Sequence, residues 1–425
     1  MRRVAAWVRG ASASPDARWL AAILALAAVV RALVVWRTPG YVPFGDAADY
    51  DRLAASLAYL GQYGTTGWAA PGGPTAFRGP AYPYLLSWVY EATGARWGAA
   101  RSAGVILGTI SVALVWEIAR RLAGLRVARW SALVWALLPT SAWLAAGLVS
   151  EVLFVPLLLG VVAAALVHRD RPHLAWPLLV GALGGLALLT RSTGVVVLLP
   201  VAVGLWTARR RLRDPLVALV VAGLVLAPWA ARNHREFGRL LPFGTHSGFT
   251  LAGAWNSGAA APGDYFAASH LAQTVPDTAE LFTPNLRDEA QLDRELRSRA
   301  LRFGREHPGF VLRATGAHLL RLLMVGQGQA HVGRLSAREM GVPETWRWTL
   351  RPPILVVAAL ALLALALTVR RRLSLGPLWV WAVPLLLLAT TAPVVGAPRY
   401  RLPLDPFLVI AATAAAGWAI AAIRR

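Results

Sequence analysis

The stretch Arg18-Trp-Leu-Ala-Ala-Ile-Leu-Ala-Leu-Ala-Ala-Val-Val-Arg-Ala-Leu-Val-Val-Trp36 is apolar apart from Arg18 and Arg31. A helix of this length can cross roughly 30 Å of hydrocarbon. Similar runs recur along the 425-residue chain, which is 57% hydrophobic and has a mean hydropathy of +0.52. Because the runs are continuous rather than alternating, they predict an all-α, polytopic helical membrane protein and exclude a transmembrane barrel.

Ten segments are predicted to span the membrane: 18–36, 100–119, 127–144, 150–168, 174–190, 193–208, 214–230, 352–369, 376–394 and 404–422. With these spans, the clusters of basic residues all fall on one side, and the positive-inside rule identifies that side as the cytoplasm. The clusters are Arg2/Arg3/Arg9, Arg120/Arg121/Arg126/Arg129, Arg169/Arg171, Arg209–Arg213, Arg370–Arg372 and Arg424/Arg425. We therefore expect a multi-pass protein of a bacterial plasma membrane with both termini in the cytoplasm.

The formal net charge of +22 comes entirely from arginine, because the chain contains no lysine. Topology accounts for most of these arginines, so the charge does not indicate nucleic-acid binding. Cysteine is absent, which leaves no disulfide and no thiolate metal site.

The spans divide the chain into three parts. Residues 1–230 form an N-terminal transmembrane module with a first external loop at 37–99, residues 231–351 form a second external region, and residues 352–425 form the C-terminal helices. Pro83–Tyr90 is too short to cross and is expected to be interfacial or re-entrant. Residues 309–325 have Arg313, His318 and Arg321 on one side and predict an amphipathic interfacial helix, and 286–305 predicts a charged helix.

Acidic residues gather where the first external loop begins, in Gly45-Asp46-Ala47-Ala48-Asp49-Tyr50-Asp51. Asp46 and Tyr50 are four residues apart and share one face of a predicted helix. Asp46 and Asp49 are candidate catalytic carboxylates, and the alternative role for both is stabilisation of the helix N-terminus. Glu151, after Ser150, is expected at the same external depth and is a third candidate, with the same alternative.

External arginines form a second unusual set, because the positive-inside rule depletes arginine from that side. They are Arg78, Arg191, Arg232, Arg399 and Arg401. The guanidinium fork suits phosphate, so we expect the set to bind a donor phosphate. The alternatives are pairing with Asp46 or Glu151, or contact with a lipid headgroup.

Metal binding has weaker support. His234 and His246 follow the seventh span but lack a recognised ligand spacing, so no metal ligand is assigned. Asp405 could cap the last helix or pair with Arg399. The expected cofactor is therefore none, with a divalent metal left open.

Five stretches together resemble the polyprenyl-phosphate-dependent glycosyltransferases of the family-39 type, within the C-type superfamily. This family includes the protein O-mannosyltransferases and the bacterial aminoarabinose transferases of lipid A. The matching stretches are Asp46-xxx-Tyr50-xxx-Ala54, Phe77-Arg78-Gly79-Pro80-Ala81-Tyr82-Pro83, Ser150-Glu151 after Pro139, Pro228-Trp229-Ala230-Ala231-Arg232-Asn233, and Arg399-Tyr400-Arg401-Leu402-Pro403. They occur in the family's order between residues 46 and 403.

The resemblance implies transfer of a sugar from a polyprenyl-phosphate carrier to an acceptor hydroxyl on the outer face of the plasma membrane. Asp46 would act as the base, the reaction would invert the anomeric centre, and the external arginines would meet the carrier phosphate. Tyr50, Asn233 and Tyr400 lie in the matched stretches and are expected to contact substrate. The implied partners are a polyprenyl-phosphate-linked sugar, a lipid, glycan or protein acceptor, and membrane lipid, with no nucleic acid.

Departures from the family pattern leave the acceptor and the metal open. Ala47 follows Asp46 where eukaryotic O-mannosyltransferases have an aspartate–glutamate pair, and the metal site of the aminoarabinose enzymes is not recognisable. The main alternative function is a transporter or flippase of a lipid-linked or anionic substrate. That class favours ionisable residues within spans and repeated halves, whereas this chain has one clear mid-span charge, Arg31, and no repeat.

Overall fold

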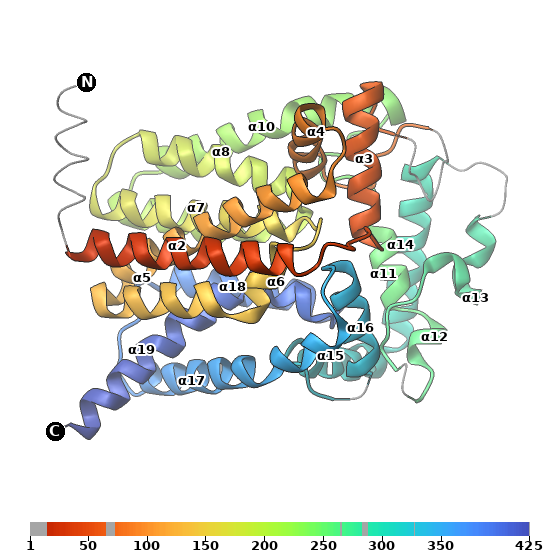
Figure 1. Cartoon of the computed structure of the whole chain (residues 1–425). Coiled ribbons are helices and arrows are strands. Elements are labelled where there is room, and N and C mark those ends of the chain that lie inside the picture. The colour runs from red at the N-terminus through yellow and green to blue at the C-terminus, as the bar shows by residue number, and fades with distance from the viewer. Residues whose placement is uncertain (1–14, 65–72, 264–265, 283–287, 327, 425) are drawn as a thin grey trace.

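The computed structural model describes residues 15–64, 73–263, 266–282, 288–326 and 328–424, and in this part of the chain the named elements are all helices (Figure 1). The predicted all-α class is thereby confirmed. Arg2, Arg3, Arg9, Arg425 and residues 286–287 belong to predicted features but lie outside the described residues.

Seven helices of the described chain are long and apolar enough to cross a membrane. They are α2 (Pro15–Trp36), α5 (Trp97–Leu137), α7 (Glu151–Asp170), α9 (Val195–Arg209) with the preceding turn η1 (Ser192–Gly194), α10 (Arg213–Phe237), α17 (Arg351–Val369) and α19 (Asp405–Ile423). Two shorter apolar helices, α8 (Ala175–Thr190) and α18 (Leu378–Thr391), pack among them. The predicted multi-pass architecture is therefore present.

The helix α5 contains two of the predicted spans. Gly124, with φ +87°, breaks its helical geometry, so the residues on either side form two separate helical segments. The second segment ends at Leu137, because Leu138 is extended, as is favoured before a proline. A short helix, α6 (Pro139–Leu144), follows. The prediction of one continuous helix over 127–144 was therefore wrong in its last turns.

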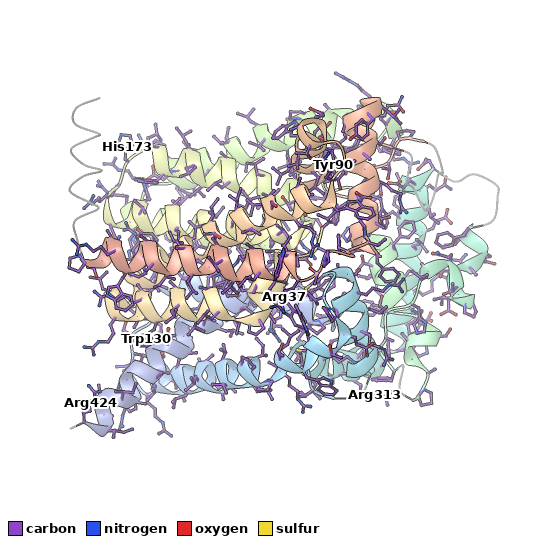
Figure 2. All side chains as sticks on the ribbon, viewed as in Figure 1. Arg37, Tyr90, Trp130, His173, Arg313 and Arg424 are labelled. Carbon is purple, nitrogen blue, oxygen red and sulfur yellow. The ribbon has the colours of Figure 1, made fainter. Side chains whose placement is uncertain are left out.

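The basic clusters meet at one end of the bundle. Arg129 pairs with Asp16 at the start of α2, and Arg121 pairs with Asp170 at the end of α7. In Figure 1 this end also holds the end of α19, and in Figure 2 it holds His173 and Arg424. The grouping agrees with the predicted topology, and its assignment to the cytoplasm stays a prediction.

The other end of the bundle is covered by shorter helices (Figure 1). The first loop supplies α3 (Asp46–Leu60) and α4 (Ala81–Thr93), and the second region supplies α11 (Ser247–Ala254), α12 (Ser257–Ala260), α13 (Pro276–Ala279), α14 (Glu289–Glu306), α15 (Pro308–Leu322) and α16 (Gln329–Glu339). Short 3-10 turns complete this end, at η2 (Ala272–Thr274), η3 (Glu280–Phe282), η4 (Glu344–Thr349) and η5 (Pro398–Arg401). With 13 residues, α4 is too short to span, as expected for 83–90.

The helix α15 is amphipathic, as the sequence predicted for 309–325. Its polar side faces the protein, where His318 Nε2 and Arg321 Nη1 each lie 2.8 Å from the carbonyl oxygen of Ala267. Leu312, on the other side, is 76% exposed. An outward apolar face of this kind suits contact with lipid.

The helix α7 forms the centre of the bundle, and most of its residues are buried. Its first residue, Glu151, therefore lies beneath the helices that cover this end, where only 1% of it is exposed. This position makes Glu151 a buried carboxylate at the junction between the bundle and the external regions.

Candidate active site

The first residue of α3, Asp46, is held between two arginines from distant parts of the chain. Arg78 Nη2 donates to Asp46 Oδ1 at 2.5 Å and to Asp49 Oδ2 at 2.8 Å. Arg399, from η5, donates to the other carboxylate oxygen of Asp46. Four predicted site residues, separated by up to 353 positions in sequence, thus meet at one point.

Local backbone geometry places these groups. Gly45 precedes α3 with φ +60°, a conformation that favours glycine, and turns the chain into the helix. Ahead of Arg78, the carboxylate of Glu289 on α14 accepts from the hydroxyl of Thr75 at 2.6 Å and from the backbone N–H of Ala76 at 2.9 Å. The second external region therefore helps to fix the segment that carries Arg78.

A second ion pair lies beside the first. Glu151 Oε1 is 2.8 Å from Arg191 Nη1, which also donates to the hydroxyl of Ser150 at 3.0 Å. The ring of Tyr400 joins the two pairs, with the guanidinium carbon of Arg191 5.1 Å from its centroid and that of Arg399 4.7 Å from it. Glu151 and Arg191 thus belong to the same polar cluster as Asp46.

Tyr50 closes the cluster on the α3 side. Its ring lies 5.5 Å from the guanidinium carbon of Arg78, and its hydroxyl lies beside Ser150. Burial raises the pKa of Tyr50, and Asp46 adds to that shift while Arg78 opposes it. The hydroxyl is therefore a neutral hydrogen-bonding group next to both ion pairs.

The arginines set the charge state of Asp46. Burial by itself would raise its pKa, but the guanidinium groups of Arg399 and Arg78 outweigh burial and hold the pKa well below its usual range. Asp46 is therefore an ionised hydrogen-bond acceptor. Burial, together with the positive charges of Arg78 and Arg191, lowers the pKa of His246 to about 4, so this imidazole is neutral.

Glu339, the last residue of α16, also belongs to this cluster. Its Oε2 is 3.1 Å from Arg399 Nη1, and its Oε1 accepts the backbone N–H of Asp46 at 3.3 Å. Sequence analysis missed it, because it lies in the least patterned part of the chain, without a motif. Its position shortly before the span at 352–369 is the only signal that could have drawn attention to it.

Two of the predicted phosphate-binding arginines lie apart from this cluster. Arg232 donates to the carbonyl oxygens of Thr75 and Tyr63, both at 2.7 Å. Arg401 is buried and donates to Asp405 Oδ1 at 2.6 Å. The suggested pairing of Asp405 with Arg399 was therefore wrong, because Arg401 is its partner.

Asn233 also lies outside the cluster. It is fully buried, and its side-chain amide donates to the carbonyl oxygen of Leu241 at 2.8 Å while its oxygen accepts from Arg232. The bond to Leu241 fastens the chain that follows α10, whereas the bond from Arg232 lies within the helix. In the structure Asn233 thus supports the loop behind the site.

No three His, Asp or Glu side chains gather closely enough to hold a metal ion within the ranges that the structure describes. His234 is exposed on α10, and the ring of His246 packs edge-on against Phe77 at 6.1 Å between centroids.

The mid-span Arg31 is buried and donates to the carbonyl oxygen of Ala136 at 3.2 Å and to the hydroxyl of Ser141 at 2.5 Å. It therefore pins α2 to the segment around α6.

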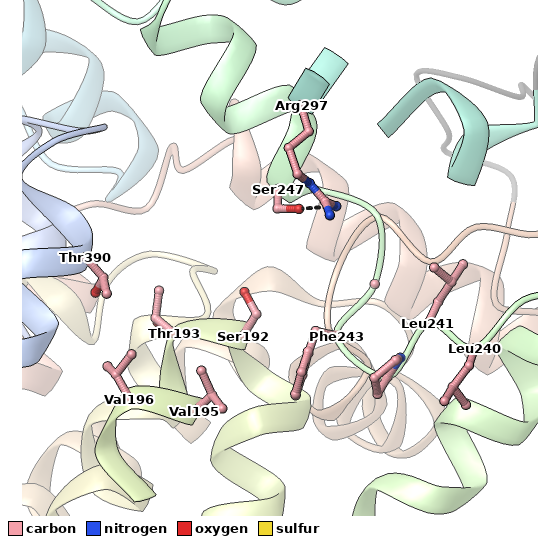
Figure 3. Close-up of a pocket in the computed structure, with 12 residues that line it drawn as sticks. Ser192, Thr193, Val195, Val196, Leu240, Leu241, Phe243, Ser247, Arg297 and Thr390 are labelled. Carbon is pink, nitrogen blue, oxygen red and sulfur yellow. Dashed lines mark hydrogen bonds between the residues drawn. The ribbon is translucent and has the colours of Figure 1, made fainter. Parts of the chain in front are cut away.

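Two cavities are lined by residues that lie close in sequence to the residues of this cluster. One, of about 420 Å³, is shown in Figure 3 and is lined by Ser192, Thr193, Val195, Val196, Leu240, Leu241, Pro242, Phe243, Gly244, Ser247, Arg297 and Thr390. Two of its lining residues, Ser192 and Ser247, directly follow Arg191 and His246 in the chain. Much of the lining is apolar. The other, of about 430 Å³, is lined by residues 37–42, which precede α3, and by Arg338 and residues 341–343 around Glu339.

Comparison with known proteins gives one family match and several structural neighbours. Residues 77–231 match the family model described as dolichyl-phosphate-mannose-protein mannosyltransferase. A search of curated protein sequences finds no match. The structure is similar to the oligosaccharyltransferase AglB from Archaeoglobus fulgidus, solved with an inhibitory peptide and a dolichol-phosphate, with a TM-score of 0.52 and 14% identity over 94% of this chain and 50% of AglB.

A further similar structure is ArnT from Cupriavidus metallidurans bound to undecaprenyl phosphate, with a TM-score of 0.44 and 16% identity over 94% of this chain and 78% of that one. At identities this low, the likeness to AglB shows a common fold, and this chain spans about half the length of AglB. The family match runs from just before α4 into α10 and includes Arg78, Glu151 and Arg191. The family match therefore supports the predicted resemblance to glycosyltransferases of the mannosyltransferase kind over residues 77–231, and the likeness to AglB supports the fold alone.

Proposed function

We propose that this protein is an inverting glycosyltransferase that moves a sugar from a polyprenyl-phosphate carrier to an acceptor hydroxyl. The observation that carries the proposal is the position of Asp46 between Arg78 and Arg399, with the Glu151–Arg191 pair alongside. Carboxylates and guanidinium groups meet where the bundle ends. This is what a reaction needs in which a hydroxyl is deprotonated and a phosphate departs.

The carrier phosphate is proposed to bind Arg78, Arg399 and Arg191. These arginines are paired with carboxylates, which keeps their charges oriented. A phosphodiester offers the same planar, two-oxygen face as a carboxylate, so it can exchange partners with them. Arg232 and Arg401 remain candidates in a supporting role, because their present bonds go to carbonyl oxygens and to Asp405.

Asp46 is the proposed base. With two guanidinium partners it is a weak base, because its pKa is held low. A phosphate that occupied Arg78 and Arg399 would remove part of that stabilisation and raise the basicity of Asp46 when the donor is in place. Asp46 would then take the proton of the acceptor hydroxyl, whose oxygen attacks the anomeric carbon as the carrier phosphate leaves.

The remaining predicted residues have subsidiary roles in this scheme. Asp49 and Glu151 would orient Arg78 and Arg191, because each forms an ion pair with one of them. Tyr50 and Tyr400 would border the donor phosphate or sugar, because their rings lie against the same guanidinium groups. Charge neutralisation of the leaving phosphate by arginine requires no metal in this scheme.

A lipid-linked donor agrees with the architecture. A polyprenyl tail can stay in the bilayer beside the apolar helices while its phosphate reaches the end of the bundle, and AglB of the same fold was solved with a dolichol-phosphate. The site is proposed to face outward from a bacterial plasma membrane, because the arginine clusters occupy the opposite end. The acceptor is proposed to be a lipid, glycan or protein outside the cell.

An assay in proteoliposomes tests the proposal. The purified protein is incubated with a panel of polyprenyl-phosphate sugars and outer-envelope extract, and mass spectrometry follows release of the free carrier phosphate. Release that depends on both the acceptor extract and Asp46 supports the function. No release from any sugar of the panel, together with movement of intact carrier between leaflets, would favour a flippase instead.

A further inference from the structure

Glu339 comes from the second external region and meets the proposed catalytic carboxylate across 293 residues of sequence. It contacts two parts of the site at once, the guanidinium of Arg399 at 3.1 Å and the first backbone N–H of α3 at 3.3 Å. A carboxylate at a helix N-terminus satisfies a free N–H and stabilises the helix dipole. Glu339 thus fixes both Arg399 and the start of α3.

The backbone around Glu339 is tightly seated. A Cβ placed on Gly45 would lie 2.5 Å from Glu339 Oε1, and one placed on Gly147 would lie 2.9 Å from the Cα of Met340. Gly341, with φ +66°, would meet the ring of Tyr41 at 2.0 Å. Three glycines from separate segments therefore let the end of α16 approach the site closely.

Asp46 and Glu339 compete for the same cation, because both bind Arg399. Burial raises the pKa of Glu339 to about 7 against the opposing charge of Arg399, and the negative charges of Asp46 and Glu151 add to the rise. These groups belong to η5, α3 and α7, which face Glu339. A further negative charge near Arg399 would make the ionised form of Glu339 still less stable.

We propose that Glu339 is a positioning residue that holds Arg399 beside Asp46 in the empty site and takes up a proton when a carrier phosphate takes its place on Arg399. This inference rests on the proposed function, since it concerns the donor phosphate. The proton comes from bulk water, which reaches Glu339 because 13% of its side chain is exposed. Charge is then balanced, because the entering phosphate brings one negative charge and the protonated carboxyl group loses one.

The sign of the pH effect follows directly. The bound state holds the proton more tightly than the empty state, so binding takes up protons near neutral pH and affinity falls as pH rises through about 7. For a rise of one pKa unit on binding, the affinity falls by about tenfold between pH 6 and pH 9. Below pH 6 Glu339 is largely protonated in both states, so the dependence disappears.

The test uses undecaprenyl methyl phosphate, a diester whose single charge does not titrate in this range and which cannot transfer a sugar. Its binding to the full-length protein in detergent is measured by calorimetry at pH 6 to 9 in buffers of different ionisation enthalpy, which counts the protons taken up. For the unaltered protein we expect a fraction of one proton taken up at pH 7 to 8. Glu339→Gln keeps an oxygen for the Asp46 N–H but cannot titrate, so its affinity should be independent of pH and tighter at pH 9.

Glu306→Gln is the matched control, because Glu306 is an exposed glutamate of the same region and should retain the pH dependence of the unaltered protein. Lipid binding by the unaltered protein without proton uptake would overturn the inference and leave the proposed function standing. The same pH dependence in Glu339→Gln would also overturn it. If the diester did not bind the unaltered protein at all, the proposed phosphate site itself would be refuted.

Discussion

Two groups of arginines at the same end of the bundle differ in what they hold. Arg78, Arg191 and Arg399 are paired with the side chains of Asp46, Asp49, Glu151 and Glu339. Arg232, by contrast, donates to backbone carbonyl oxygens, and Arg401 to Asp405 and a backbone carbonyl oxygen. The carboxylates around the first group can rotate away to admit a ligand. Backbone carbonyls are fixed by the fold, and Asp405 is fully buried and also accepts from the hydroxyl of Thr140. The first group is therefore suited to exchange partners with phosphate, and the second to hold the scaffold.

Among the changes that test this difference, removal of the negative charge of Asp46 should have the largest effect, and the effect should be on turnover. Asp46→Asn is expected to lower turnover by about 10³-fold, because general-base catalysis is lost. Asparagine can accept from only one of Arg78 and Arg399, because its NH2 group donates, so the thermal unfolding temperature should fall and turnover is compared on protein that remains folded. The rate of carrier-phosphate release measures the effect. Asp51→Asn, on the same helix but bonded to Tyr90 and Trp97, is the control and should keep most activity.

Substitution of an arginine of the second group, which holds the scaffold, should lower the stability of the folded protein. Arg401→Ala leaves Asp405 buried without its cation, which should cost about 3–5 kcal/mol of folding free energy. Thermal unfolding in detergent, read by intrinsic tryptophan fluorescence, should show a lower midpoint. Protein that remains folded at low temperature should bind a polyprenyl phosphate with unchanged affinity. A selective loss of lipid affinity at full stability would move Arg401 into the first group.

Substitution of an arginine of the first group should lower the affinity of the protein for a polyprenyl phosphate. Arg399→Ala removes a charged hydrogen-bond donor and should weaken binding of a polyprenyl phosphate by about tenfold to a hundredfold. Arg52→Ala is a matched control, because Arg52 pairs with Asp49 and its side chain is 53% exposed. Its affinity should stay close to that of the unaltered protein. Equal affinities for Arg399→Ala and the unaltered protein would remove Arg399 from the phosphate site.

The smallest effect is expected from a chelator. If arginines alone neutralise the leaving phosphate, EDTA should leave the rate of carrier release unchanged, and added Mg²⁺ or Mn²⁺ should not raise it. The comparison is made on one batch of protein before and after dialysis against EDTA. A large loss that divalent cations restore would show that the carboxylates also serve a metal.

The sequence predicted the helical architecture well, because continuous apolar runs have few other structures open to them in a membrane. One error came from local chemistry, because the segment 127–144 ends early where Leu138 precedes Pro139. This feature does not change hydropathy, so a search for apolar runs does not detect it. The break of α5 at Gly124, by contrast, falls between the predicted spans 100–119 and 127–144.

The site was predicted in part, for an equally physical reason. The exclusion of arginine from the outer side singled out Arg78, Arg191 and Arg399, which the structure brings together. Arg232 and Arg401 also lie on the outer side, but they bond to carbonyl oxygens or to Asp405. Composition cannot distinguish arginines of this kind from those that gather in the cluster. Glu339 was missed because only the tertiary fold carries α16 to α3.

A structure determined with a polyprenyl phosphate bound tests the central claim most directly. The account predicts phosphate oxygens within hydrogen-bonding distance of Arg78 and Arg399, with the carboxylate of Asp46 released from at least one of them and turned toward the space beside the phosphate. A phosphate bound elsewhere, with both ion pairs of Asp46 intact, would contradict it.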